Sequence, residues 1–324
     1  MKKERKAPIF ITKLSKLVKR IPPNHFKKQE FQDLLRNHSS GFKGEQSLEY
    51  FYRYLPKDIL YLHGLRILDD EYFFQMDTLL ITPSFITILE IKYMAGHLYF
   101  EDQFFQFIRT HAGKEEAFPN PIDQVSRQKI HLTRVLKQHK LNLVPIETLV
   151  VMTHPAAIIE AASGYQEANE KVIKSSSLQQ KYETLLQKYP NSIITQKQVK
   201  KLARLLLKLS SSYDPDICEL FQVNKNELSK GVFCPTCPHS IMNYTWGKWH
   251  CSTCNTSSKT AHIEALQDYA LLISNHISNY EFAWYLNLQS SSQAYHLLRS
   301  LNLPSIGTNR TRLYNLTPLL EKTT

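Results

Sequence analysis

The chain has 324 residues, a length typical of about two domains. Hydrophobic residues make up 42% and charged residues 21%, which excludes disordered, collagen-like and coiled-coil chains. No apolar run approaches the roughly 18 residues that a membrane helix needs, and the basic start Met1–Lys6 is not followed by the apolar core of a signal peptide. We therefore expect a soluble, cytoplasmic protein without a membrane partner.

The charge balance is basic. Lys and Arg number 40 against 29 Asp and Glu, a formal net charge of +11. Residues 1–36 hold eleven Lys and Arg with three acids, and residues 188–208 hold six Lys and Arg with none. Such a balance indicates an anionic partner, with nucleic acid ahead of a membrane surface. A solvated tail and an ordinary helix face explain the two runs equally well.

The first half of the chain predicts an α/β domain. Residues 44–55 have the apolar spacing of a helix, and residues 72–82 and 85–93 read as two strands joined by a turn. Asn120-Pro121 has the residue types of a helix N-cap and first turn, and residues 146–152 resemble a buried strand. The order helix, strand, strand, helix, strand predicts a mixed sheet flanked by helices.

Changes in composition along the chain predict several modules. They are a basic N-terminal arm at 1–36, an α/β core at 37–155, a helical and basic connecting region at 156–228, a small cysteine-containing β module at 229–258 and a mainly helical module at 259–324.

The strongest candidate for catalysis lies on the two predicted strands. Glu90 and Lys92 project from one face of the second strand, because side chains alternate along a strand, and the turn would bring Asp77 opposite Glu90. Two carboxylates about 4 Å apart can hold Mg²⁺. The ammonium of Lys92 would orient an attacking water or stabilise developing charge. The set predicts metal-assisted hydrolysis of a phosphodiester, with Asp77 and Glu90 binding Mg²⁺ or Mn²⁺.

A purely structural interpretation also has to be considered. Acids and lysines on strands usually face solvent, but Glu90 interrupts an otherwise apolar strand, where an acid should be paired or coordinating. His97 and His111 lie near this set in the sequence. A lone histidine is more often structural than catalytic.

The motifs of this region resemble the nuclease-related domain family (NERD), a branch of the PD-(D/E)xK restriction-endonuclease-like superfamily. The resemblance covers roughly residues 38–155, and its pieces are Gly41–Glu45, Gln75–Asp77, Glu90–Lys92 with Gly96, and Asn120–Gln124. It implies an α/β nuclease core in which Asp77 and Glu90 bind the metal and Lys92 is catalytic. It also implies that Glu45 is a further acidic site residue and that Gln124 lines the site. Met76 stands where the family tends to have a branched aliphatic residue.

Gly44 fits the same site on physical grounds. It precedes Glu45 and is expected near the start of a helix, where a small residue allows a phosphate to approach.

Four of the five cysteines form a predicted metal site. Cys234 and Cys237 make one Cys-x-x-Cys pair, and Cys251 and Cys254 make a second after thirteen intervening residues. This spacing is typical of a zinc ribbon, in which four thiolates hold one structural Zn²⁺. The flanking His239 and His250 could each replace one ligand. Lys248 on the intervening hairpin could touch nucleic acid, although such ribbons also stabilise folds or bind proteins.

The C-terminal module resembles a winged helix-turn-helix. Ser278 and Glu281 have capping-box spacing, and a serine-rich turn precedes a helix at 293–301 and a predicted hairpin. In that arrangement the second helix, with Gln293, Tyr295, His296 and Arg299, would read the major groove, and Arg310 and Arg312 would contact phosphate. A helical protein-interaction domain remains an alternative.

Together these features predict a Mg²⁺-dependent DNA nuclease. The ribbon and the C-terminal module would supply nucleic-acid or protein binding. The alternatives are a non-catalytic nucleic-acid-binding or regulatory protein that keeps the nuclease fold, an RNA-directed enzyme, and an interaction scaffold.

Overall fold

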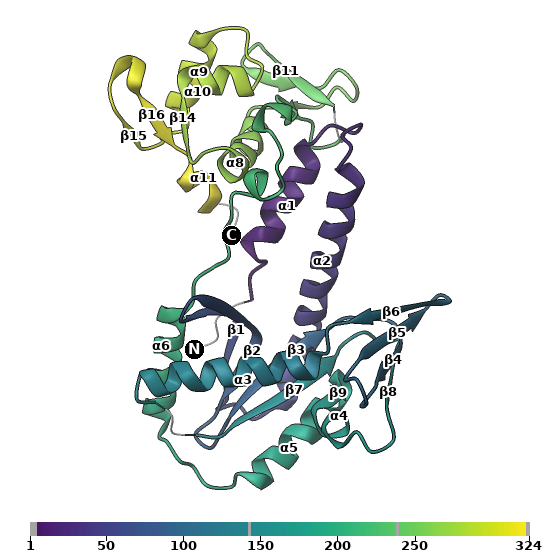
Figure 1. Cartoon of the computed structure of the whole chain (residues 1–324). Helices are drawn as coiled ribbons and strands as arrows, with labels where there is room; N and C mark the ends of the chain where they lie inside the picture. Colours follow the sequence, from purple (N-terminus) through teal and green to yellow (C-terminus); the bar gives the residue numbers. More distant parts are fainter. Residues whose placement is uncertain (1–4, 142–143, 238–239, 322–324) are drawn as a thin grey trace. The chain divides into compact units, whose positions relative to one another are not determined.

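The computed structural model describes residues 5–141, 144–237 and 240–321 (Figure 1). The chain divides into two compact units. The first consists of Met1–Pro8 and Arg36–Tyr213, and the second of Ile9–Leu35 and Asp214–Thr324. No helix in the described part of the chain is long and apolar enough to cross a membrane.

The first unit is built on a five-stranded mixed sheet. Its order is β1 (Leu60–Asp69), β2 (Tyr72–Ile81), β3 (Ile86–Lys92), β7 (Ile146–Met152) and β9 (Val172–Lys174). Strands β1, β2 and β3 are antiparallel neighbours, whereas β7 runs parallel to β3 and β9 runs parallel to β7. The predicted α/β class with a mixed sheet is therefore confirmed.

Helices cover both faces of this sheet, as Figure 1 shows for α3. The helices are α2 (Lys28–Phe51), α3 (Pro121–Gln138), α5 (Leu178–Lys188) and α6 (Gln196–Leu209). On one face α3 and α6 share a buried cluster with Ile88 of β3, and on the other α2 and α5 share one with Leu89. The short helix η1 (Tyr52–Tyr54) follows α2, and η2 (Ser175–Ser177) precedes α5.

The caps predicted for α3 are present. The side chain of Asn120 accepts a hydrogen bond from the amide of Ile122 at 2.9 Å, and Pro121 is the first helical residue. Thr195 and Gln198 form a capping box at the start of α6. These caps satisfy amides that have no partner within the helix and so fix where each helix begins.

A second sheet extends the first unit. Its order is β6 (Lys114–Phe118), β5 (Phe107–His111), β4 (Gly96–Phe100) and β8 (Ala157–Ala161). The rings of Phe100 and Phe107 pack at a centroid distance of 4.7 Å within a cluster that also contains Ile122 of α3 and Ala168 of α4 (Gln166–Lys171). This packing fixes the start of α3 beside the end of β3.

The second unit includes most of residues 1–36. Helix α1 (Ile9–Arg20) and the first residues of α2 pack with α7 (Ile217–Leu220) and α8 (His262–Leu272) through a buried apolar cluster. Arg20 and Asp268 are both buried, and Nε of Arg20 donates to Oδ2 of Asp268 at 2.8 Å.

Several other cations of this segment are also paired within the second unit. Lys13 pairs with Asp214, and Lys16 and Lys19 both pair with Glu264. The positive charge at these positions therefore supports the fold and is not a free surface for nucleic acid.

The rest of the second unit contains two small sheets. The first has the order β10 (Val232–Phe233), β11 (Ile241–Thr245), β12 (Lys248–His250) and β13 (Ser257–Ser258), and the second has the order β14 (His276–Ser278), β16 (Leu313–Asn315) and β15 (Ser305–Ile306). The remaining elements are η3 (Lys225–Glu227), α9 (Asn279–Tyr285), α10 (Ser291–Ser300), η4 (Asn309–Thr311) and α11 (Thr317–Glu321). Ser278 and Glu281 form the predicted capping box of α9.

Candidate active site and candidate metal centre

The candidate catalytic residues gather where the antiparallel ladder between β2 and β3 stops, beside the C-terminal end of β3. The antiparallel ladder between these strands reaches the pair Thr78 and Leu89, so the same register places Asp77 beside Glu90. The amide of Ile91 donates to Oδ2 of Asp77 at 2.8 Å, which ties the Asp77 carboxylate to the neighbouring strand. Asp77 and Glu90 thus lie beside each other, as expected from the predicted hairpin.

A local irregularity in β1 and β2 accompanies Asp77. Leu62 and Leu65 of β1 lie in one buried cluster although they are three residues apart, and so do Met76 and Leu79 of β2. Regular strands would place such residues on opposite faces. Gly64, at the register position opposite Asp77, has a φ of +57°, a conformation that glycine adopts without steric cost. We infer that this irregularity frees Asp77 to reach β3.

Glu90 and Lys92 face α3. Nζ of Lys92 donates to Oε1 of Glu90 at 2.7 Å and to Oε1 of Gln124 at 3.0 Å. Nε2 of Gln128 donates to Oε2 of Glu90 at 2.8 Å and to the carbonyl of Gln75 at 2.8 Å. Both carboxylate oxygens of the buried Glu90 therefore have fixed partners.

Gln128 was not predicted from the sequence. It follows the predicted Gln124 by four residues, which places both amides on one face of α3. That spacing is the signal that could have identified it.

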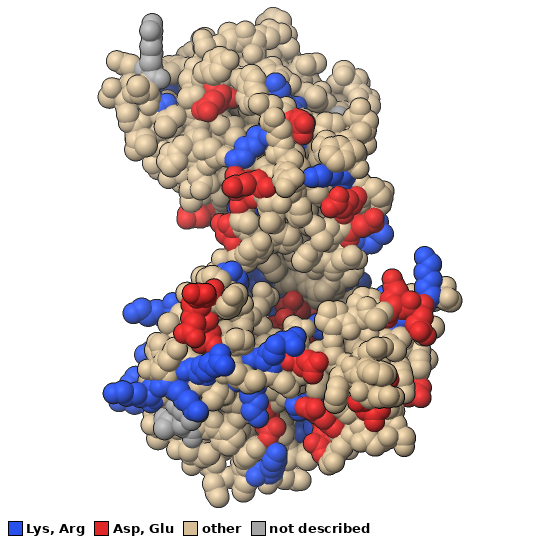
Figure 2. Space-filling view, viewed as in Figure 1, with Lys and Arg blue, Asp and Glu red and all other residues tan. Residues whose placement is uncertain are grey.

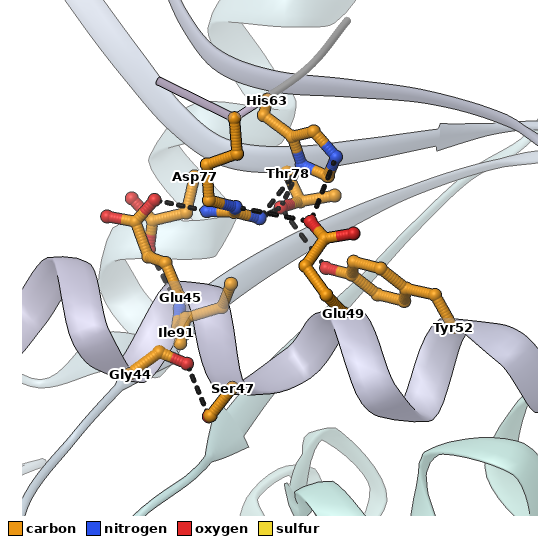
Figure 3. A network of polar contacts seen from close by, with 10 residues as sticks. Gly44, Glu45, Ser47, Glu49, Tyr52, His63, Asp77, Thr78 and Ile91 are labelled. Carbon is orange, nitrogen blue, oxygen red and sulfur yellow. Dashed lines mark hydrogen bonds and ion pairs between the residues drawn. The ribbon is translucent and has the colours of Figure 1, made fainter. Parts of the chain in front are cut away.

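Glu45 belongs to α2, where it pairs with Arg5 of the N-terminal segment. Figure 3 shows Glu45 near Asp77, with Glu49, Tyr52, His63 and Thr78 in the same polar network. Arg5, Glu49, His63 and Thr78 were not predicted as neighbours of the site. The sequence carries no signal for Arg5, because it reads as one more cation of a basic segment.

The expectation that Gly44 lies at a helix start is wrong. Helix α2 begins at Lys28, so Gly44 is inside it. A Cβ atom at Gly44 would clash with Cβ of Tyr93 and lie 3.0 Å from Oγ1 of Thr153. Glycine is therefore needed because α2 approaches the segments that follow β3 and β7 closely.

The electrostatic environment of the acids is unfavourable for their charge. Burial raises the pKa of Asp77 well above its usual value, and the neighbouring carboxylates of Glu90 and Glu45 raise it further. Burial also raises the pKa of Glu45, although Arg5 opposes that shift. A divalent cation would relieve this repulsion, and carboxylate oxygens are the ligands that Mg²⁺ prefers. The residues present therefore fit such a cation.

The four predicted cysteines form a candidate metal centre. Their Sγ atoms all lie within 4.8 Å of one another, and the amides of Thr236 and Cys237 each donate to Sγ of Cys234 at 3.4 Å. Four thiolates at this separation suit the tetrahedral coordination of Zn²⁺. Hydrogen bonds with Thr256 lower the pKa of Cys254 to about 6, which favours the thiolate form that binds metal. The cluster could therefore hold one zinc ion.

Of the two flanking histidines, His250 does not belong to this group of candidate ligands. Nδ1 of His250 is 2.7 Å from Oγ of Ser257, and His239 lies outside the described residues.

The candidate nucleic-acid-binding residues belong to the second unit. Lys248 on β12 is exposed, and so is Arg299 on α10, which donates to the hydroxyl of Tyr295 at 3.3 Å. Arg312 follows η4 and is partly buried, whereas the side chain of Arg310 lies outside the described part of the structure. Their proposed contacts with nucleic acid stay predictions.

Comparison with known proteins supports the resemblance noted from the motifs. No curated protein and no solved structure gives a significant match. Residues 40–153 match the family model described as nuclease-related domain, NERD. This segment holds Glu45, Asp77, Glu90, Lys92 and Gln124. Residues 40–153 of the chain are therefore a nuclease-related domain of the NERD family.

Proposed function

We propose that the protein is a Mg²⁺-dependent nuclease that hydrolyses phosphodiester bonds in DNA. The observation that carries this proposal is that Asp77 of β2 lies beside Glu90 and Lys92 at the end of β3, inside a nuclease-related domain. A bound Mg²⁺ or Mn²⁺ would supply a water of lowered pKa and neutralise charge on the scissile phosphate.

The protein's own residues have distinct proposed roles. Asp77 and Glu90 would hold the cation, and Glu45 would add a third carboxylate to the site. Lys92, held by Glu90 and Gln124, would orient the attacking water or stabilise the charge that develops on the phosphate. Gln128 would keep Glu90 in place through its hydrogen bond to Oε2.

The cysteine centre is proposed to bind a structural zinc ion. Four protein thiolates leave no open coordination position, so the ion would stabilise the small β10–β13 sheet and would not take part in catalysis.

Two surfaces support DNA as the partner. Figure 2 shows Lys and Arg side chains gathered over α3 and α6. On α6 the cations Lys197, Lys200, Lys201, Arg204 and Lys208 are all exposed. Because α3 begins at the candidate site, where Gln124 accepts from Lys92, this basic face would lead a phosphate backbone toward the acids.

The second surface is the C-terminal module, proposed to be winged-helix-like. Its order is α8, β14, α9, α10, β15 and β16, with the three strands in one sheet. Ser290 caps α10, on which Tyr295, His296 and Arg299 are exposed. In a winged helix, a helix in this position enters the major groove.

Incubation with a panel of nucleic acids tests this function. Wild type and Asp77→Asn would be compared on plasmid, linear and single-stranded DNA and on RNA, each with Mg²⁺, Mn²⁺ or EDTA. We expect metal-dependent cleavage of DNA by wild type alone. Binding without cleavage under every condition would favour the non-catalytic alternative, and preference for RNA would correct the substrate.

A further inference from the structure

A side chain of the N-terminal segment is buried against the candidate metal site. The side chain of Arg5 is only 5% exposed, and its guanidinium forms ion pairs with Glu45 and Glu49 of α2. Nη2 also donates to Oγ1 of Thr78 at 2.9 Å and lies 2.8 Å from Nδ1 of His63. Four side chains from α2, β1 and β2 thus hold one guanidinium.

The groups around Arg5 form a network of polar contacts. The hydroxyl of Tyr52 donates to Oγ1 of Thr78 at 3.3 Å, and Nδ1 of His63 is 3.1 Å from the same oxygen. Tyr52, His63 and Thr78 are all buried. Figure 3 shows these three side chains and Glu49 on one side of the network and Glu45 with Asp77 on the other. The network around Arg5 therefore extends to the acids of the candidate site.

Arg5 changes the charge that a metal would meet. The site holds four carboxylates, Glu45, Glu49, Asp77 and Glu90, and two cations, Arg5 and Lys92. With all six ionised the net charge is two negative, which one divalent cation neutralises. Without Arg5 the net charge is three negative, and the affinity of oxygen sites for divalent cations rises with ligand charge.

Arg5 also occupies one of the carboxylates proposed for the site, through its ion pair with Glu45. Among the described residues, the only group of three or more candidate ligands whose atoms all lie within 4.8 Å is the set of four cysteines. Glu45, Asp77 and Glu90 do not converge to that degree while Glu45 is paired with Arg5. A cation bound by all three acids would require the three carboxylates to come closer together and Glu45 to give up its ion pair with Arg5.

We propose that Arg5 is an internal competitor of the divalent cation: the N-terminal segment places its guanidinium on Glu45, lowers the affinity of the site for Mg²⁺ and is displaced when the cation takes that carboxylate. This inference rests on the proposed function, because it assumes that the acids bind a catalytic cation.

Calorimetric titration of the full chain with Mg²⁺, without DNA, tests the competition. Arg5→Gln should bind Mg²⁺ about tenfold more tightly than wild type, since one positive charge near the cation is removed. Arg5→Lys, which keeps the charge, should remain within about twofold of wild type. Lys6→Gln is the matched control, because it removes the same charge from the next residue, which is exposed. Its affinity should not change.

Protease protection in wild type gives a second readout that does not require a variant to fold. The buried Arg5 should be cleaved slowly by an arginine-specific protease, and Mg²⁺ should accelerate cleavage after Arg5 at constant ionic strength. Asp77→Asn, which lacks a proposed ligand, should show no acceleration.

The outcomes separate this inference from the proposed function. The competition is wrong if wild type binds Mg²⁺ and Arg5→Gln binds it no more tightly. It is also wrong if bound Mg²⁺ does not change the rate of cleavage after Arg5. In both cases the nuclease proposal stands. If neither protein binds Mg²⁺ or Mn²⁺, both proposals fail.

Discussion

Gln128 of α3 holds Glu90 of β3 from the side opposite Lys92. Its Nε2 donates to Oε2 of Glu90 at 2.8 Å, while Nζ of Lys92 donates to Oε1 at 2.7 Å. The same Gln128 nitrogen reaches the carbonyl of Gln75 on β2. One amide thus connects the helix to both strands that carry the candidate metal ligands.

Replacing Gln128 should weaken catalysis without removing a ligand. In Gln128→Ala the Glu90 carboxylate loses one of its two partners, and we expect DNA cleavage to fall about 10- to 100-fold, as is typical for groups that orient metal ligands. Steady-state cleavage and calorimetric Mg²⁺ binding would be measured. Gln138→Ala, at the exposed end of the same helix, is the control. Equal rates for the two variants would contradict a positioning role.

Asp77 should reduce the stability of the metal-free protein. Folding raises the pKa of the Asp77 carboxyl, so the folded state favours its protonated form. The stability that this group contributes is fully present below the usual pKa of aspartate. It is lost as the pH rises through the raised pKa. Asp77→Asn removes the ionisation, and its amide oxygen can still accept from Ile91. At neutral pH in EDTA we expect the variant to be more stable by on the order of 1 kcal/mol.

Urea unfolding measures this difference, which should shrink as the pH falls toward about 4. Added Mg²⁺ should stabilise wild type and leave Asp77→Asn unchanged. If Asp77→Asn is less stable than wild type at neutral pH in EDTA, the negative charge of Asp77 does not destabilise the metal-free protein.

The cysteine centre should hold one zinc ion per chain. Cys234→Ser should lose the ion and lower the thermal stability of the second unit, because a closed thiolate site stabilises the fold that forms it. Elemental analysis and thermal unfolding are the measurements. Cys218→Ala is the matched control, since Cys218 is buried away from the cluster beside the carbonyl of Leu272. Zinc that persists in Cys234→Ser would refute the four-cysteine set.

The basic face over α6 should bind the phosphate backbone. The double variant Lys200→Glu/Arg204→Glu should weaken DNA binding at least about tenfold near 0.1 M salt and reduce the salt dependence of log K by about two. The control is the double variant Lys57→Glu/Lys174→Glu, which makes the same charge change at two exposed positions away from α6. Lys57 lines a hollow together with Glu183 of α5, and Lys174 is the last residue of β9. Equal losses in the two pairs, measured by fluorescence anisotropy, would mean that no specific face is used.

Local pattern was enough to predict much of the fold and the central pair of acids. The strands around Asp77 and Glu90 are joined by a short turn, so their register followed from counting residues. The N-cap at Asn120 and the capping box at Ser278 followed from residue type and spacing. The two Cys-x-x-Cys pairs were readable for the same reason.

Contacts between distant segments could not be predicted in this way. Arg20 pairs with Asp268 across 248 positions, and Arg5 reaches Thr78 across 73, so both cations read only as part of a basic run. The start of α2 at Lys28 was also missed. The first part of α2 has few buried residues, so its sequence lacks the continuous apolar stripe that would have indicated a helix.

The most direct test of the central claim is Mg²⁺-dependent cleavage of labelled DNA by wild type and Lys92→Ala at saturating protein. Wild type should cleave with Mg²⁺ and not with EDTA. Lys92→Ala should bind the same DNA and Mg²⁺ but cleave about 10²- to 10³-fold more slowly, because the charge facing Glu90 and Gln124 is lost. The exposed Lys57→Ala should match wild type. Equal cleavage by Lys92→Ala and wild type, or cleavage that persists in EDTA, would contradict a metal-dependent nuclease site at β2 and β3.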